Sequence, residues 1–200
     1  MKSISVDELA AKSAAHLLNS SVIPRPIAWV SSIDAAGTAN LAPHSYFNAV
    51  SADPPIVMFA SAHSSQLDPR GRKDTLRNIE ATREFVVQIV SEEMIGPMNR
   101  TAAEVPSATD EFELAGLDKC RSMSVRPPRI AGIGAALECR LNRLLDVGDA
   151  TVVFGDVLVI HVEESLLQEG RVDPDRLRPL GRLGGSNYAG LGQIISLRRP

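Results

Sequence analysis

The chain has 200 residues, a formal charge of −3 at pH 7 and a pI near 5.8, with 44% hydrophobic and 22% charged residues. This composition is ordinary for a globular chain that is long enough to bury a sizeable core. The weakly acidic balance offers no basic footprint for nucleic acid, and no apolar run approaches the roughly 18 residues of a membrane helix.

The N-terminal residues and the cysteines bear on where in the cell the protein is located. Residues 1–8 lack the apolar core of a signal peptide. The two cysteines, Cys120 and Cys139, cannot build a disulfide framework. The four histidines lie far apart in the sequence, so we expect no dedicated metal site. We expect a cytoplasmic protein with a single domain over residues 1–200 and no membrane partner.

The first 50 residues predict a helix followed by a hairpin. Asp7 can cap a helix with a weak apolar stripe that contains Leu17 and Leu18. Residues 27–33 are apolar and tolerate a strand, and residues 34–37 supply turn chemistry that includes a glycine. A second strand then runs into a loop at residues 40–48, which is rich in polar and aromatic side chains.

Short elements follow along the rest of the chain. They are a turn at residues 51–55, a strand buried on both faces at 56–60, a helix at 74–82, a strand at 84–90 and a helical segment at about 92–100. Residues 137–142 alternate between apolar and polar, and a break at 143–145 indicates a bulge or a barrel corner. Residues 151–162 form a long apolar strand. Strands without a βαβ rhythm favour a mainly β fold, an antiparallel barrel with a few short helices.

A candidate anion site lies at the start of the helix at residues 74–82. Lys73 stands where unpaired backbone N–H groups and the helix dipole favour a negative charge, and Thr75 adds a hydroxyl. Ser61, Ser64 or Ser65 could reach in from the preceding loop, which together would suit a phosphate. The alternative is that Asp74 is an N-cap and the basic residues are surface charges.

A candidate site for a flat ring lies in the loop at residues 40–48. Backbone groups near Ala42, Pro43 and His44, with the side chains of Asn40, Ser45 and Asn48, could bond the edge of a heterocycle; Tyr46 and Phe47 add rings. The alternative is a polar edge strand whose rings fill the core. The glycine-rich residues 181–188 could approach a ligand closely or form a flexible C-terminal loop.

Several motifs in order along the chain resemble the flavin reductase-like family. They are residues 25–48, the turn at 51–55, residues 73–79 and 84–87, Asp110-Glu111-Phe112 with Leu117, residues 137–139, the strand at 155–157, and residues 181–185 with Tyr188. The resemblance covers roughly residues 20–190. It implies an FMN-binding split β-barrel and a homodimer with FMN near the subunit interface.

The resemblance also implies the site residues and the activity. The implied FMN-binding residues are Ser31, Asn40, Ala42, Pro43, His44, Ser45, Asn48, Ser61, Ser64, Lys73, Asp74, Thr75 and Tyr188. The implied activity is hydride transfer from NADH or NADPH to the flavin, with an oxygenase as a partner that receives reduced flavin. A flavin supplies most of this chemistry itself, so no catalytic side chain is assigned. The alternative is a flavin-binding electron carrier without turnover.

Overall fold

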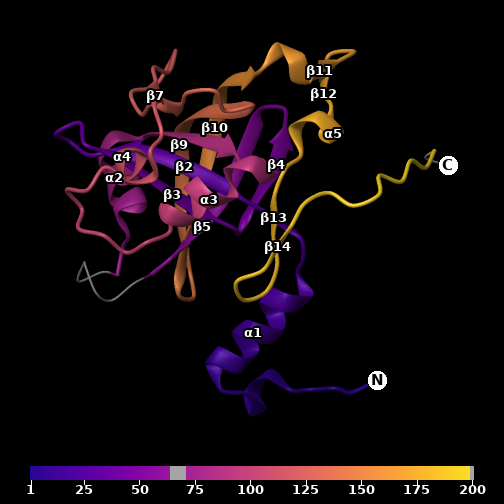
Figure 1. Ribbon diagram of the computed structural model, residues 1–200. Coiled ribbons are helices and arrows are strands. Elements are labelled where there is room, and N and C mark those ends of the chain that lie inside the picture. Colours follow the sequence, from indigo (N-terminus) through magenta and orange to yellow (C-terminus); the bar gives the residue numbers. More distant parts are fainter. Residues whose placement is uncertain (64–70, 199–200) are drawn as a thin grey trace.

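The structure is a computed structural model and describes residues 1–63 and 71–198 (Figure 1). Its helices are α1 (Ala11–Ser21), α2 (Asp74–Thr82), α3 (Ile95–Arg100), α4 (Glu111–Ala115) and α5 (Pro174–Leu177). Its longer strands are β2 (Ala28–Ile33), β3 (Ala39–His44), β4 (Phe47–Ala52), β5 (Pro55–Ala62), β6 (Glu84–Ile89), β9 (Ala135–Val147) and β10 (Ala150–Val162). The two-residue strands are β1 (Arg25–Pro26), β7 (Lys119–Cys120), β8 (Arg129–Ile130), β11 (Leu167–Gln168), β12 (Arg171–Val172), β13 (Gly181–Arg182) and β14 (Tyr188–Ala189).

The seven longer strands form one antiparallel sheet in the order β3-β2-β6-β9-β10-β5-β4. The two edge strands, β3 and β4, are joined directly by Ser45 and Tyr46, so the sheet curls until its edges meet at that link. The N–H of Ala60 on β5 donates to the carbonyl of Tyr46 at 2.8 Å, which extends the β4–β5 pairing into the link. The rings of His44 on β3 and Phe59 on β5 lie 4.7 Å apart, so the two sides of the sheet are in contact there. The expected antiparallel barrel is confirmed.

Two apolar clusters pack against opposite faces of this sheet. Inside the barrel, alternate residues of β2 such as Val30 meet Leu76 and Ile79 of α2, which closes the barrel with its apolar face. Outside it, Trp29 on the other face of β2 packs with Met98 of α3 and Phe112 of α4. Helices α2 and α4 are therefore held over β2 and β3, and this places their first residues beside the polar part of β3 (Figure 1).

The long hairpin of β9 and β10 contains the expected irregularity. Phe154 pairs with Arg143 and Gly155 pairs with Leu141, so Asn142 is an extra residue in β9. Gly155 allows the two sides of the barrel to meet here, since a Cβ at this position would lie 2.3 Å from the Cζ atom of Phe85. The sequence break at residues 143–145 thus marks a bulge within one continuous strand.

Two expectations about local structure are wrong. Asp7 lies in a 3₁₀ turn at Val6–Glu8, and α1 begins only at Ala11, after an alanine that makes no side-chain cap. Helix α1 has no buried residue, so packing does not extend it toward Asp7. Residues 56–60 are also not buried on both faces: Val57 and Phe59 face the core, while Ile56 and Met58 are half-buried.

Both ends of the chain project from the barrel with apolar side chains exposed. In Figure 1, α1 extends away from the sheet, and residues 190–198 run outward as an extended tail. Leu18 of α1 is 59% exposed and Leu197 of the tail 87% exposed. In the described ranges, no helix is both long enough and apolar enough to span a membrane.

Candidate flavin site

Helix α2 starts at Asp74, as the sequence predicts, but its N-cap residue is Lys73, which makes no side-chain capping bond. Asp74 is the first helical residue, and its carboxylate pairs with Arg77 one turn on and accepts a hydrogen bond from Ser107 Oγ at 2.8 Å. The expectation that Asp74 caps the helix is therefore wrong. The ammonium group of Lys73 has no ion pair with any residue that the structure describes, whereas the neighbouring Arg72 pairs with Glu80 and Asp74 pairs with Arg77.

The predicted loop at residues 40–48 is two strands joined by a two-residue turn, so this expectation is also wrong. β3 extends through Asn40, Ala42, Pro43 and His44, and β4 starts at Phe47. Pro43 lacks an N–H group, yet it is tolerated because β3 is an edge strand with an unpaired side. The alternative interpretation, a polar edge strand, is confirmed for β3, although Tyr46 is exposed and only Phe47 packs against the core.

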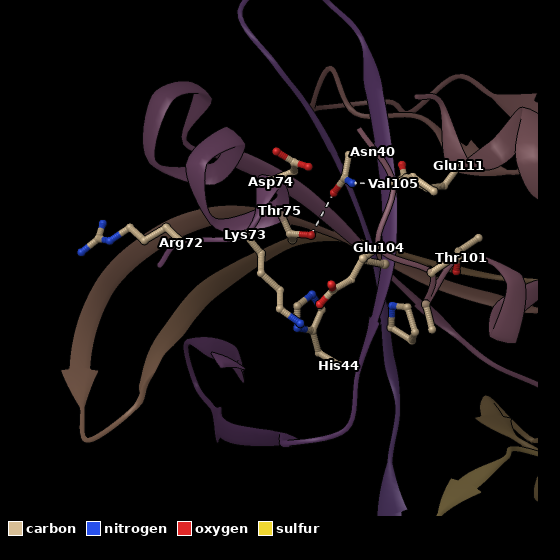
Figure 2. A pocket seen from close by; sticks show the side chains of 14 residues that line it. Asn40, His44, Arg72, Lys73, Asp74, Thr75, Thr101, Glu104, Val105 and Glu111 are labelled. Atoms are coloured by element: carbon tan, nitrogen blue, oxygen red, sulfur yellow. Dashed lines mark hydrogen bonds between the residues drawn. The ribbon is translucent and has the colours of Figure 1, made fainter. Parts of the chain in front are cut away.

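Two hollows adjoin β3 and share part of one wall. The smaller, of about 230 Å³, lies between β3, the start of α2, and the loop that follows α3. The larger, of about 980 Å³, lies between the turn at Ser45 and Tyr46, helix α1, and the loop between β13 and β14. Pro43, His44 and Lys73 line both hollows. Figure 2 shows the Lys73 ammonium group extending toward the ring of His44.

Most of the residues predicted to bind FMN gather at these two hollows. Asn40, Ala42, Pro43, His44, Lys73, Asp74 and Thr75 line the smaller one, and Ser45 lines the larger with Pro43, His44 and Lys73. Residues 25–48 and 73–75 are thus brought together by the packing of α2 on the barrel, although they are far apart in the sequence.

Four predicted residues lie elsewhere among the residues described. Ser31 is buried on the outer face of β2, where its hydroxyl donates to the carbonyl of Pro128 at 2.6 Å. Ser61 is buried on the opposite face of β5 from Ala60 and Ala62, which line the larger hollow. Asn48 is exposed on β4, and the Tyr188 hydroxyl accepts a hydrogen bond from Arg182. Ser64 lies outside the described residues, as does Ser65.

Burial and charge hold His44 in its neutral form. Removal from water is the main cause, and the nearby charge of Lys73 adds to it, so the pKa of His44 falls from 6.5 to about 3. Its Nε2 atom is buried and has no hydrogen-bond partner in the described part of the chain. An uncharged ring with an unbonded nitrogen therefore lies in the shared wall of the two hollows, near the charge of Lys73.

Sequence reasoning missed several residues of these walls. One of them is Glu111, which lies at the start of α4 and is only 5% exposed, and burial raises its pKa despite hydrogen bonds from β3. The loop at residues 101–105 covers the smaller hollow, and Arg25, Asn19 and Arg182 border the larger one. The motif Asp110-Glu111-Phe112 entered the sequence analysis only through the family resemblance; in the structure it starts α4, which the Asp110 carboxylate caps by accepting from the Phe112 N–H.

The arrangement matches proteins of known family and structure. Residues 20–180 match the model of the flavin reductase like domain. A protein of Aquifex aeolicus is 44% identical over 168 residues, which are 84% of this chain and 84% of that protein.

Two solved structures are similar in both sequence and fold. The nitrilotriacetate monooxygenase component B of Bacillus cereus is 37% identical, with a TM-score of 0.93 over 98% of each chain. The 2-nitrobenzoate 2-nitroreductase of Pseudomonas fluorescens is 34% identical, with a TM-score of 0.89 over 100% of this chain and 96% of that one. On this evidence, and with its closed antiparallel sheet, the chain is a split-barrel member of the flavin reductase-like family.

Proposed function

We propose that the protein is a flavin reductase that binds FMN and transfers hydride to it from NADH or NADPH. The observation that carries this proposal is Lys73, a cation that has no ion pair among the described residues and lies at the N-terminus of α2, where the two hollows meet. The N–H groups of Leu76 and Arg77 donate to the carbonyl of Lys73, whereas those of Asp74 and Thr75 precede these first helical bonds, so cation and helix terminus together favour a phosphate.

Two residues next to Lys73, Thr75 and Asp74, would affect phosphate binding in different ways. The single hydroxyl hydrogen of Thr75 goes to Asn40 Oδ1, at an O–O distance of 2.8 Å, so Thr75 would bond a phosphate through its backbone N–H rather than its side chain. The paired carboxylate of Asp74 is turned to Arg77 and Ser107. This pairing reduces its repulsion of an anion that binds beside Lys73.

The larger hollow has the size and the polar groups for the ring end of FMN and for a nicotinamide. Ligand sites commonly measure about 300–1,000 Å³ and combine apolar walls with a few placed polar groups. Here Pro43 and Tyr46 offer flat apolar surface, while His44 Nε2 is a buried group still free to bond. The bound flavin would itself supply the hydride acceptor, so this chain need only bind, orient and exclude water.

The names of two similar proteins suggest what would use the reduced flavin or its electrons. The similarity to a monooxygenase component B supports transfer of reduced flavin to a separate oxygenase. The similarity to a nitroreductase supports a different electron acceptor, a nitroaromatic acid that the reduced flavin would reduce. In either case the first half-reaction, from nicotinamide to flavin, is the same.

Rapid reduction of the flavin by a nicotinamide tests the proposal. We expect the purified protein reconstituted with FMN to lose its flavin absorbance within seconds when it is mixed anaerobically with NADH or NADPH in a stopped-flow instrument. Free FMN with the same nucleotides is the control. A protein that binds FMN, yet is bleached only by dithionite, would instead be an electron carrier.

We also propose a homodimer, because the described residues of one chain leave apolar side chains on α1 and β10 uncovered. Leu17 and Leu18 of α1 are exposed, and Ile160 on β10 is 63% exposed. The larger hollow is bordered by α1, so a second chain packed on α1 would also narrow this site.

Analytical ultracentrifugation should therefore find a species of twice 21.5 kDa. Leu18→Lys should shift it toward monomer and weaken FMN binding, because a charge buried in an apolar interface has no partner. Leu114→Lys, at an exposed leucine of α4, is the matched control. A wild-type monomer with full affinity for FMN would contradict the dimer.

A further inference from the structure

We propose that Glu111 is a positioning residue: it fixes the side-chain amide of Asn40 so that an N–H donor, and not the carbonyl, faces the smaller hollow. The ligand group that this donor recognises is then an acceptor, such as a carbonyl, an unprotonated ring nitrogen or a phosphate oxygen. This inference rests on the proposed function, since it takes FMN, bound where the two hollows meet, as the ligand that carries the acceptor.

The carboxylate of Glu111 holds one side of the arrangement. Its Oε1 accepts from Asn40 Nδ2 at 2.9 Å, and its Oε2 accepts from the backbone N–H of Leu41 at 3.0 Å. An ionised carboxylate can only accept, so it forces the NH₂ end of the Asn40 amide to face α4. The buried position of Glu111 makes both bonds costly to lose.

Hydroxyl groups hold the carbonyl end of the same amide. Asn40 Oδ1 accepts from Thr75 Oγ1 at 2.8 Å and from Ser32 Oγ at 3.3 Å. Ser32 in turn accepts from Asn78 Nδ2 at 3.1 Å, which leaves its own hydrogen for Asn40. Figure 2 shows the Asn40 side chain between Thr75 and Glu111, with its oxygen toward Thr75.

One hydrogen of the Asn40 amide remains after these bonds are counted. Both acceptor sites on Oδ1 are taken, and one of the two Nδ2 hydrogens goes to Glu111. The second Nδ2 hydrogen has no acceptor among residues 1–63 and 71–198. Since Asn40 lines the smaller hollow, this hydrogen is the group that the network leaves for a ligand.

Glutamine at position 111 would reverse this amide. The Glu111→Gln side chain has one acceptor and one donor end, so it can satisfy Leu41 N–H and Asn40 together only if Asn40 turns its oxygen toward α4. The hydroxyl oxygens of Thr75 and Ser32 can accept from the turned amide nitrogen, although their own hydrogens then lose Asn40 as an acceptor. The hollow would then receive a carbonyl oxygen in place of the N–H.

Two measurements test the orientation and its consequence. In the flavin-free protein, NMR should show stronger NOEs between the Asn40 amide hydrogens and the Thr75 methyl group in Glu111→Gln than in the wild type. In fluorescence titrations, Glu111→Gln should bind FMN about tenfold or more weakly, because an acceptor would then face an acceptor. Glu113→Gln, at an exposed glutamate two residues on, is the control and should match the wild type.

A double-mutant cycle distinguishes positioning from a general structural role. If Glu111 acts through Asn40, Glu111→Gln should no longer change FMN affinity in an Asn40→Ala background. Thr75→Val is the variant to use if Glu111→Gln does not fold. Glu111 still bonds Asn40 in Thr75→Val, so the amide should keep its orientation and FMN affinity should fall by no more than about threefold.

The outcomes separate this inference from the proposed function. Wild-type protein that binds no FMN would overturn the proposed function and the ligand named here. FMN binding that is unaffected by Glu111→Gln, an equal effect of that change in the Asn40→Ala background, or a reversed amide in Thr75→Val would overturn the positioning role alone.

Discussion

Replacing His44 by asparagine should make the folded protein less sensitive to acid. The pKa of His44 is about 3 in the folded chain, mainly because the ring is buried, and about 6.5 when unfolded. Below pH 6.5 the unfolded chain therefore binds a proton that the folded chain excludes, and stability is lost as the pH falls toward 3. Between pH 7.5 and 4.5 this amounts to about 3 kcal/mol, at roughly 1.4 kcal/mol per pH unit below 6.5.

The measurement is the free energy of unfolding in urea, at pH 7.5 and 4.5, of flavin-free protein. Carboxylates such as Asp146, whose pKa is lowered by a hydrogen bond from Thr151, also destabilise the fold in acid, but equally in all variants. The quantity to compare is thus the loss between the two pH values. It should be smaller by about 3 kcal/mol in His44→Asn, and unchanged in the control His16→Asn on exposed α1. Equal losses in all three proteins would show that His44 is not buried in its neutral form.

Removing the charge of Lys73 should weaken FMN binding by about 1–3 kcal/mol, the range for a charge-assisted hydrogen bond. Lys73→Arg keeps the charge and should retain more of the affinity than Lys73→Ala. The readout is a fluorescence titration of FMN, repeated at high salt, where the difference between the variants should shrink.

Two controls make the Lys73 result specific. Arg171→Ala removes an exposed cation from β12, which pairs only with β11 in its own small sheet, and should leave the affinity unchanged. Riboflavin lacks the phosphate, so Lys73→Ala should bind it as well as the wild type does. Unchanged FMN affinity in Lys73→Ala would remove this residue from the phosphate site.

The sequence predicts well those elements that have one hydrophobic periodicity and a clear signal at the end of the helix or strand. Helix α2 occupies residues 74–82 as expected, because Leu76 and Ile79 form one apolar face and Arg83 ends the helix in a left-handed conformation. β3 was mistaken for a loop, because its polar residues and Pro43 are signals of a turn. An edge strand beside a hollow tolerates both, and only the tertiary structure shows that β3 is such a strand.

The site shows the same limit at the level of single side chains. Lys73 could be identified because a helix start is visible in the sequence, and so is a cation placed there. Glu111 could not be assigned to the site, since an acidic residue in the first turn of a helix is ordinary for its interaction with the dipole. What distinguishes Glu111 is a contact with Asn40, 71 residues away, that arises only when α4 packs against β3.

The shared wall at Lys73 and His44 has a thermodynamic consequence for the two hollows. Part of what lowers the pKa of His44 is the positive charge of Lys73. An anion bound beside Lys73 would offset that charge and raise the proton affinity of the ring. By linkage, protons and the anion must then favour each other's binding to the same degree. The anion would thus bind less tightly as the pH rises through the pKa of His44, about 3, without any movement of the backbone.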